Sequence, residues 1–151
     1  QGNLLIEKKI NLKITTPRGI KFVEQADMLI MRCVDGDLGV LPGHAPASVV
    51  LGDGILRIFN DGAEKKLAVF GGIAEIGSKD VNIFSTIAQP PEEIDRERAI
   101  KDRKKVEAAM QEESGSQVQR LQSLLRHTLV RIEVSSQLEE SDYYNDSSDE
   151  E

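Results

Sequence analysis

The chain is poor in the residues that usually carry chemistry. It holds one cysteine, two histidines, no tryptophan, four phenylalanines and two tyrosines in 151 residues. Cys33 has no second cysteine with which to form a disulfide or share a metal ion, so we expect it to be a small buried side chain. No apolar run approaches the ~20 residues of a membrane-spanning helix. No basic-then-apolar leader is seen either, so we expect a soluble, cytoplasmic kind of chain without direct membrane insertion.

Charge is balanced over most of the chain, which argues against a nucleic-acid partner. Residues 1–90 carry ten basic and ten acidic side chains, and residues 91–138 carry nine of each. The net charge of −7 comes entirely from residues 139–151, which carry seven acidic side chains and no basic one. A segment so acidic and so poor in aliphatic residues lacks the means to build a core. We therefore predict a disordered acidic tail over residues 138–151.

Sequence motifs of catalysis are also missing. The chain has no G-x-x-x-x-G-K-[ST] loop, no H-E-x-x-H and no cluster of cysteine and histidine. A general base needs a nucleophile and an orienting group, and the sequence indicates neither for His44. We therefore assign no catalytic residue, no metal ligand and no cofactor, and a small enzyme is disfavoured.

Residues 3–88 read as many short strands. Ile10, Leu12 and Ile14 alternate with polar residues, as in a strand with one buried face. The Asp-Gly step after Asn60 and the turn residues 77–80 each predict a hairpin. We expect residues 48–51 and 55–59 to be separate strands, divided by Gly52-Asp53-Gly54. Strands at this spacing predict a two-layer β-sandwich, because a single layer would leave one apolar face in water.

The segment Gly36–Pro46, with sequence GDLGVLPGHAP, combines three glycines and two prolines around a small apolar centre. Glycine permits positive φ, whereas proline fixes φ and removes a hydrogen-bond donor. We expect one irregular loop that is not part of any strand and that exposes Asp37 and His44.

From Pro90 to residue 137 the sequence predicts an antiparallel helical hairpin. Residues 94–113 contain no glycine or proline and favour a polar first helix, and Ser114-Gly115-Ser116 ends it. The second helix carries an apolar stripe at spacings of three and four, made of Val118, Leu121, Leu125, Leu129 and Ile132, with Leu124 beside it. Because the first helix is too polar to cover this stripe, we expect it to seek the sandwich, another protein, or each in turn. The predicted class is therefore α+β, a sandwich followed by a hairpin.

The Gly36–Pro46 segment resembles the G-x-L-G-x-L-P-G-H-A-P segment of the epsilon subunit of F-type ATP synthase, which is the delta subunit in mitochondria. The resemblance spans roughly residues 10–137 and includes Gly71-Gly72-Ile73. It implies a non-catalytic central-stalk subunit that couples the gamma subunit to the membrane rotor ring of c subunits. It also implies that the hairpin restrains ATP hydrolysis by reaching the alpha and beta subunits of the catalytic head.

The resemblance implies roles for particular residues and a location. Asp37 matches the acidic residue that faces the rotor ring, and Gly43 and His44 belong to the same rotor interface. On the residues alone, Asp37 is equally well a solvated loop acid and His44 a residue that shapes a turn. The implied location is peripheral, on the cytoplasmic face of a bacterial membrane, or on an organellar membrane in a eukaryote. A free-standing ligand-binding β-sandwich is the alternative, although six aromatic residues give it little support.

Residues 94–99, Ile-Asp-Arg-Glu-Arg-Ala, fit the I/L-D-x-x-R-A motif of bacterial epsilon subunits, some of which bind a regulatory ATP. The resemblance implies nucleotide-binding roles for Ile94, Asp95, Arg98 and Ala99. The planar guanidinium of Arg98 suits a phosphate group. Asp95 has an alternative explanation, because an acidic residue is favourable at the start of a helix. Two departures favour the helix start: Gln89 replaces an acid of the ATP-binding relatives, and the second helix lacks two arginines one turn apart.

Overall fold

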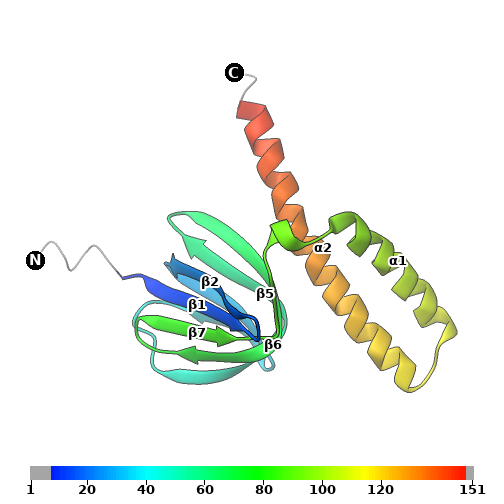
Figure 1. Cartoon of the computed structure of the whole chain (residues 1–151), viewed down its shortest axis with the longest axis horizontal. Coiled ribbons are helices and arrows are strands. Elements are labelled where there is room, and N and C mark those ends of the chain that lie inside the picture. The colour runs from blue at the N-terminus through cyan, green and yellow to red at the C-terminus, as the bar shows by residue number, and fades with distance from the viewer. Residues whose placement is uncertain (1–7, 149–151) are drawn as a thin grey trace, which may run out of the picture. The chain divides into compact units, whose positions relative to one another are not determined.

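The computed structural model describes the backbone of residues 8–148 and the side chains of residues 8–138. Residues 3–7 of the predicted sandwich domain therefore lie outside the described residues. The chain divides into two compact units, residues 1–88 and 89–151, and each is described by itself. Figure 1 shows strands in the first unit and helices in the second.

The first unit is made of strands joined by short connections. In chain order they are β1 (Ile10–Thr16), β2 (Gly19–Ala26), β3 (Met28–Cys33), β4 (Gly36–Val40), β5 (Ala47–Asn60), β6 (Ala63–Ile76), β7 (Asp80–Phe84) and β8 (Ile87–Gln89). They hydrogen bond in the order β2-β1-β7-β6-β5-β3-β4, and β8 pairs with β6. Along this path only β1 and β7 are parallel, so the predicted antiparallel sandwich contains one parallel pair.

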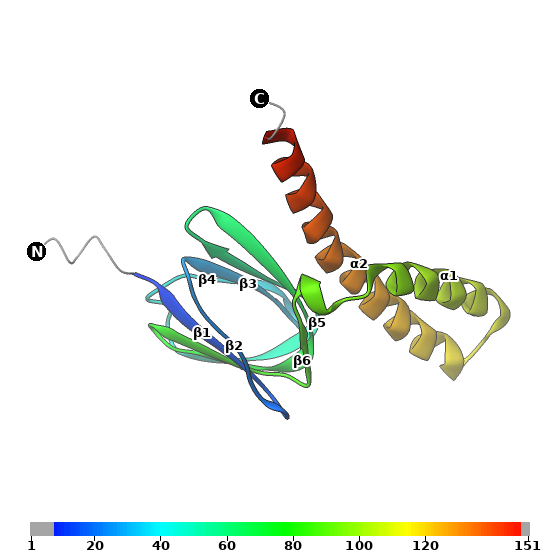
Figure 2. The ribbon, with the colours of Figure 1, turned by 45° about the horizontal axis from the view of Figure 1, so that its top comes forward.

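The core lies between the two layers, which Figure 2 shows on either side of the interior. The predicted alternation in β1 is confirmed, because Ile10, Leu12 and Ile14 are at most 1% exposed. Cys33 is also buried, with a free thiol. Burial raises the pKa of this thiol, and a thiol with a raised pKa is a poor nucleophile. Cys33 is therefore a packing residue, as the sequence predicts.

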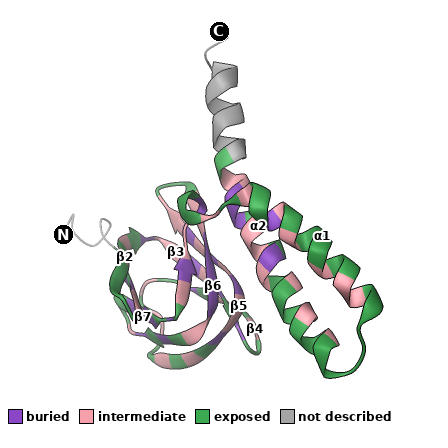
Figure 3. Cartoon of the chain, turned by 45° about the vertical axis from the view of Figure 1, so that its right-hand side comes forward, coloured by how far each residue is buried: buried purple, intermediate pink, exposed green. Residues whose placement is uncertain are grey.

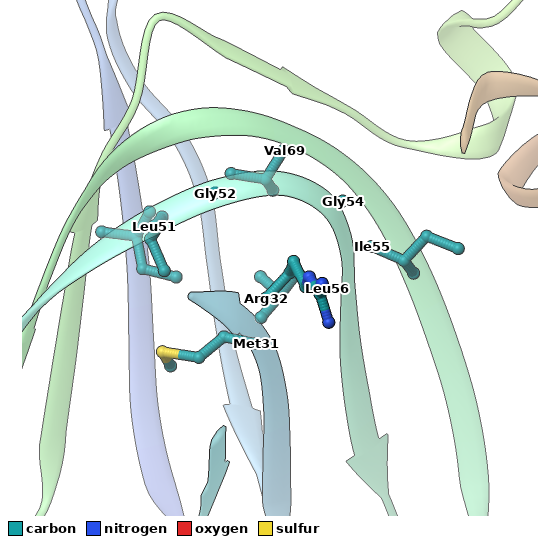
Figure 4. A pocket seen from close by; sticks show the side chains of 9 residues that line it. Met31, Arg32, Leu51, Gly52, Gly54, Ile55, Leu56 and Val69 are labelled. Atoms are coloured by element: carbon teal, nitrogen blue, oxygen red, sulfur yellow. The ribbon is translucent and has the colours of Figure 1, made fainter. Parts of the chain in front are cut away.

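Strand β5 is longer than the sequence predicts. We expected a break at Gly52-Asp53-Gly54, but β5 continues through these residues as it bends, and β6 continues through Gly71 and Gly72. At the bend, Arg32 lies against Gly54 (Figure 4), where a Cβ atom would lie 2.7 Å from Cβ and Cγ of Arg32. Glycine therefore allows one strand to serve both layers instead of ending it. The cavity beside the bend measures about 10 Å³, room for about one water molecule.

The prediction that Gly36–Pro46 is a single irregular loop is wrong for its first half. Gly36–Val40 forms strand β4, which pairs with β3. Val40 is 1% exposed and Leu38 packs against the core, so this strand has a buried face. Its place at the end of the strand order explains why glycine is tolerated there, since an edge strand has fewer neighbours to satisfy.

The second unit is the predicted helical hairpin. A short 3-10 helix, η2 (Pro91–Glu93), precedes α1 (Arg96–Glu112), and α2 (Ser116–Ser148) follows. Gly115 has a φ of +73° in the predicted connection, so the hairpin turns where the sequence indicates. Figure 3 shows that the face of α2 toward α1 is partly buried and that much of its surface is exposed. The buried positions of the described part of α2 are Thr128, Val134 and Ser135, none of which the predicted leucine stripe included.

The acidic tail that we predicted from residue 138 begins inside α2, because the helical backbone continues to Ser148. Residues 149–151 lie outside the described residues. Residues 116–151 contain no glycine or proline, and extending an existing helix is much easier than starting a new one. The second helix of the hairpin therefore ends further along the chain than the change in charge suggested.

Charged side chains connect three segments of the first unit: Lys9 before β1, Asp27 between β2 and β3, and Asp61 between β5 and β6. The Lys9 Nζ lies 2.6 Å from an oxygen of Asp27 and 2.9 Å from an oxygen of Asp61. The Asp61 backbone N–H donates to Asp27 Oδ2 at 2.8 Å. The hydrogen bond from Lys9 lowers the pKa of Asp27, and its bonds to Asp27 and Asp61 raise the pKa of Lys9.

Glycine at position 72 is predicted to be essential for stability. Its φ is +119°, and a Cβ atom there would lie 2.2 Å from the Phe84 carbonyl oxygen. Gly72→Ala should lower the free energy of unfolding by about 3 kcal/mol or more, measured by urea denaturation. Gly62→Ala is the control: its φ is +81° but its Cβ atom would meet nothing within 4 Å, so strain alone should cost about 1 kcal/mol. Equal losses would contradict the steric argument.

Stability should also depend on pH through Asp27. Because its pKa is lower in the folded than in the unfolded chain, its contribution to stability is full above about pH 5 and is lost as the pH falls through the folded pKa. Asp27→Asn should make the loss of stability between about pH 5 and 2 shallower, measured by urea denaturation across that range. A wild-type slope in Asp27→Asn would rule out this ion pair as the cause.

Candidate functional site

Asp37 lies on β4, where it is directly opposite Arg32 of β3. Its Oδ1 is 3.3 Å from Arg32 Nη1, and both side chains are more than half exposed. An exposed pair of this kind contributes little to stability. The structure therefore leaves Asp37 accessible, with a partner that another protein can displace.

Gly43 and His44 lie in a firmly held turn after β4. The Gly43 N–H donates to the Ser78 carbonyl at 2.7 Å, and the His44 N–H donates to the Leu41 carbonyl at 3.1 Å. The φ of Gly43 is +85° and space beside it is open, so a side chain there would be strained by the backbone alone. The His44 Nδ1 donates to the Ala45 carbonyl at 2.6 Å, which orients the imidazole within its own turn.

The structure brings Gly43 and His44 together but leaves Asp37 apart from them. From Asp37 to Val40 the strand alone spans about 10 Å, and none of the interactions among the described residues joins Asp37 to His44. The predicted rotor interface is therefore two exposed places along one segment.

The same end of this unit carries a hollow that the sequence did not indicate. It measures about 490 Å³ and is lined by Lys8, Lys9, Asn11, Gln25, Pro42, Gly43, Ser78 and Lys79. Lys79 is far in sequence from Lys8 and Lys9, so no local motif indicates the hollow. The hollow adds positive charge beside Gly43.

Asp95 caps helix α1. Its Oδ1 accepts from the Arg98 backbone N–H at 3.1 Å, and its backbone is extended, as in an N-cap residue. The helix start that we weighed against nucleotide binding is thus confirmed for Asp95. Ala99 is buried, and Ile94 precedes the helix at the end of η2.

The predicted nucleotide residues also share one hollow of the hairpin. It measures about 280 Å³ and is lined by Gln89, Glu93, Ile94, Asp95, Arg98, Ala99, Asp102, Thr128 and Arg131. The Arg131 Nε donates to the Gln89 Oε1 at 2.9 Å. Burial lowers the pKa of Arg131, while Asp102 opposes that shift. Gln89 therefore supplies a neutral partner to a partly buried guanidinium.

The charges of this hollow set what it can bind. Arg98 and Arg131 offer planar donor forks that suit phosphate, but Glu93, Asp95 and Asp102 place three carboxylates around them. A highly charged anion would be attracted by the two arginines and repelled by the three carboxylates, so we expect it to bind with weak affinity. Sequence reasoning missed Asp102, Thr128 and Arg131. The signal was available, because Asp95 and Asp102 are spaced to share one face of α1, and Thr128 and Arg131 one face of α2.

Among the described residues, no group of three acidic, histidine or cysteine side chains is placed to hold a metal ion. No helix in the described part of the chain is long and apolar enough to cross a membrane.

Fold and site together define a class of small proteins with a β-sandwich followed by a helical hairpin. Residues 9–91 match the family model of the ATP synthase delta/epsilon chain, beta-sandwich domain. The chain is 32% identical to the ATP synthase epsilon chain of Caldicellulosiruptor saccharolyticus, over 83% of this chain and 93% of that relative. It is 33% identical to the epsilon chain of Bacillus velezensis, over 85% and 98% of the two chains.

A solved structure agrees with these sequence relatives. A chain of the Euglena gracilis mitochondrial ATP synthase, solved as OSCP/F1/c-ring in rotational state 1, has a TM-score of 0.63 and 25% identity. The match covers 90% of this chain and 82% of that one. The chain therefore belongs to the ATP synthase delta/epsilon family, and it is an epsilon-type subunit of that enzyme complex.

Proposed function

We propose that the chain is a non-catalytic subunit of the central stalk of an F-type ATP synthase. In this role the sandwich couples the gamma subunit to the ring of c subunits, and the hairpin restrains ATP hydrolysis. Family membership supports the assignment, as does likeness to a chain solved with F1 and the c-ring. The location that follows is peripheral, on the cytoplasmic face of a bacterial membrane or on the corresponding face of an organellar one.

The coupling role is supported by the rigid, exposed turn around Gly43. Three contacts fix this turn: its hydrogen bond to Ser78, the bond of His44 to Leu41, and the orienting bond of the imidazole to Ala45. A rigid turn transmits force between two partners without first paying the entropy of ordering a loop. We assign contacts with gamma or the ring to Gly43 and His44, and a contact with the ring to Asp37.

The inhibitory role is carried by exposed leucines on α2. Leu124, Leu129 and Leu138 are 40–43% exposed, so α1 covers only part of the apolar surface of its neighbour. Such a surface favours docking onto another protein. Basic residues of α1 are also exposed: Arg103 pairs with Glu107 at 2.9 Å, and Lys104 and Lys105 follow it. These charges suit acidic surfaces of the alpha and beta subunits.

A regulatory nucleotide is a further part of the proposal. The hollow that contains Ile94, Asp95, Arg98 and Ala99 has room for part of ATP, with Arg98 and Arg131 toward phosphate. Bound ATP would hold α1 and α2 together, which would favour the folded hairpin over a hairpin that opens toward gamma.

Calorimetry on the isolated full chain tests the nucleotide. We expect ATP to bind only in the millimolar range, because three carboxylates surround the two arginines. Arg98→Ala should weaken binding about tenfold, the effect of one charge-assisted hydrogen bond. Lys101→Ala, an exposed change on the same helix that does not line the hollow, should leave it unchanged. No heat of binding at millimolar ATP would remove nucleotide from the proposal.

Deleting residues 90–151 should raise ATP hydrolysis by the assembled complex and leave assembly intact, because the core of the sandwich is formed within residues 10–88. Complex purified from membranes would be assayed for subunit content and for hydrolysis. If the exposed leucines carry the restraint, Leu124→Ser with Leu129→Ser should reproduce the increase, and Gln122→Ser should not.

Failure of the intact chain to co-purify with the stalk and head subunits would reject the stalk assignment. Unchanged hydrolysis after the deletion would instead reject the inhibitory role and leave a passive coupling subunit.

A further inference from the structure

The hollow beside Gly43 lies where two parallel strands begin. Strands β1 and β7 pair in parallel, with Asn11 opposite Asp80, so the residues that precede both strands lie at one end of the sandwich. Lys8 and Lys79 therefore come together although they are far apart in the chain, and both line this hollow of about 490 Å³. We call it the lysine hollow, after Lys8, Lys9 and Lys79 in its lining.

Hydrogen bonds of the backbone fix the shape of the lysine hollow. The Asn11 N–H donates to the Lys79 carbonyl at 2.7 Å, and the Gly43 N–H donates to the Ser78 carbonyl at 2.7 Å. These two bonds join the start of β1, the turn before β7 and the turn after β4. A ligand that enters the hollow therefore has no loop to order first, which favours binding.

The amide side chains of the hollow already have partners. Gln25 of β2 is opposite Asn11 of β1, and its Nε2 donates to Asn11 Oδ1 at 3.3 Å. The Asn11 Nδ2 in turn donates to Asp80 Oδ1 at 3.2 Å. This series of bonds also engages an oxygen of Asp80, a residue that does not line the hollow. The amides therefore form a polar wall, and the lysines are the groups that remain for a ligand.

The three lysines differ in their partners. The Lys9 Nζ lies 2.6 Å from an oxygen of Asp27 and 2.9 Å from an oxygen of Asp61, so two carboxylates balance its charge. Lys8 and Lys79 are exposed. Among the described residues, neither of them forms an ion pair and no acidic side chain lines the hollow. Lys8 and Lys79 thus offer positive charge that the described part of the chain does not neutralise.

We propose that the lysine hollow binds a phosphate group, with Lys8 and Lys79 as its cationic partners. An ammonium group binds phosphate as a point charge, and the Ser78 hydroxyl offers a further donor. The volume of the hollow lies in the range of small-molecule sites, roughly 300–1,000 Å³. The hollow therefore also has room for part of the molecule that carries the phosphate.

Two sources can supply this group: the head group of an anionic phospholipid, or a phosphate compound free in solution. We expect the phospholipid, and this expectation rests on the proposed function. Pro42 and Gly43 line the lysine hollow, and Gly43 is assigned to a contact with gamma or with the ring of c subunits. A contact with a ring in the membrane would bring head groups near this end of the sandwich, where an anionic surface attracts lysines within about one Debye length.

Vesicles that contain phosphatidylglycerol and phosphatidylcholine, compared with vesicles of phosphatidylcholine alone, test the head group. Binding of the full chain would be measured by sedimentation with the vesicles at low salt. Lys8→Gln with Lys79→Gln should weaken binding to the phosphatidylglycerol vesicles about 30-fold, because each lysine near an anionic surface contributes about fivefold. Added salt should weaken binding of the wild type, because it screens the charges.

Two matched variants separate the lysine hollow from overall charge. Lys8→Arg with Lys79→Arg keeps both charges and should bind like the wild type. Lys13→Gln with Lys101→Gln removes two charges at exposed positions outside the hollow, and it should bind within about twofold of the wild type. All variants keep the acidic residues 139–151, so repulsion of that segment by the vesicles cancels in the comparison. Thermal unfolding checks that each variant is folded.

Calorimetry of the full chain with inorganic phosphate covers the free source. Millimolar binding that Lys8→Gln with Lys79→Gln abolishes, without binding of the wild type to vesicles, would assign the lysine hollow to a free phosphate compound. No binding of the wild type to either probe would overturn the proposal, and so would equal binding by the wild type and this variant. Co-purification with the stalk and head subunits is a separate measurement, so either result would leave the stalk assignment standing.

Discussion

Close backbone contact at the bends of β5 and β6 is the constraint on which the sandwich depends. Gly72 lies so near the Phe84 carbonyl that a Cβ atom would be 2.2 Å from it, and Gly54 meets the Arg32 side chain in the same way. Because these positions carry no side chain, two 14-residue strands bend and serve both layers. The bends bring β7 onto β6 and β3 onto β5, and this pairing sets which side chains reach each face.

The outer surface follows from that pairing. Ile73 and Phe84 become neighbours only because β6 and β7 pair in one register, and Val50 joins them through β5. A shift by one residue would turn these side chains inward and expose the core. The exposed apolar side chains of this face are therefore a consequence of strand register, which the buried face of the same strands also fixes.

The stability of the hairpin depends on a small contact between two helices and not on a large core. Helix α1 is polar and needs its Asp95 cap, whereas α2 keeps leucines exposed beside it. Helices that bury little surface against each other gain little from staying together. A partner that covers the leucines can thus compete with the hairpin contact, and a ligand between Arg98 and Arg131 can oppose that partner. These are the physical requirements for a regulatory element that two binding events move in opposite directions.

The sequence by itself determined the class of fold, the two hairpin turns, the buried face of β1 and the switch from strands to helices after Pro90. Each depends on residues close together in the chain, where alternation, turn residues and helix spacing act locally. Tertiary structure alone decided that the glycine segments bend strands instead of ending them, that Gly36–Val40 is an edge strand, and that Thr128 and Arg131 join Asp95 and Arg98 around one hollow. Glycine permits both a turn and a bend, and only the strands packed around it select between them.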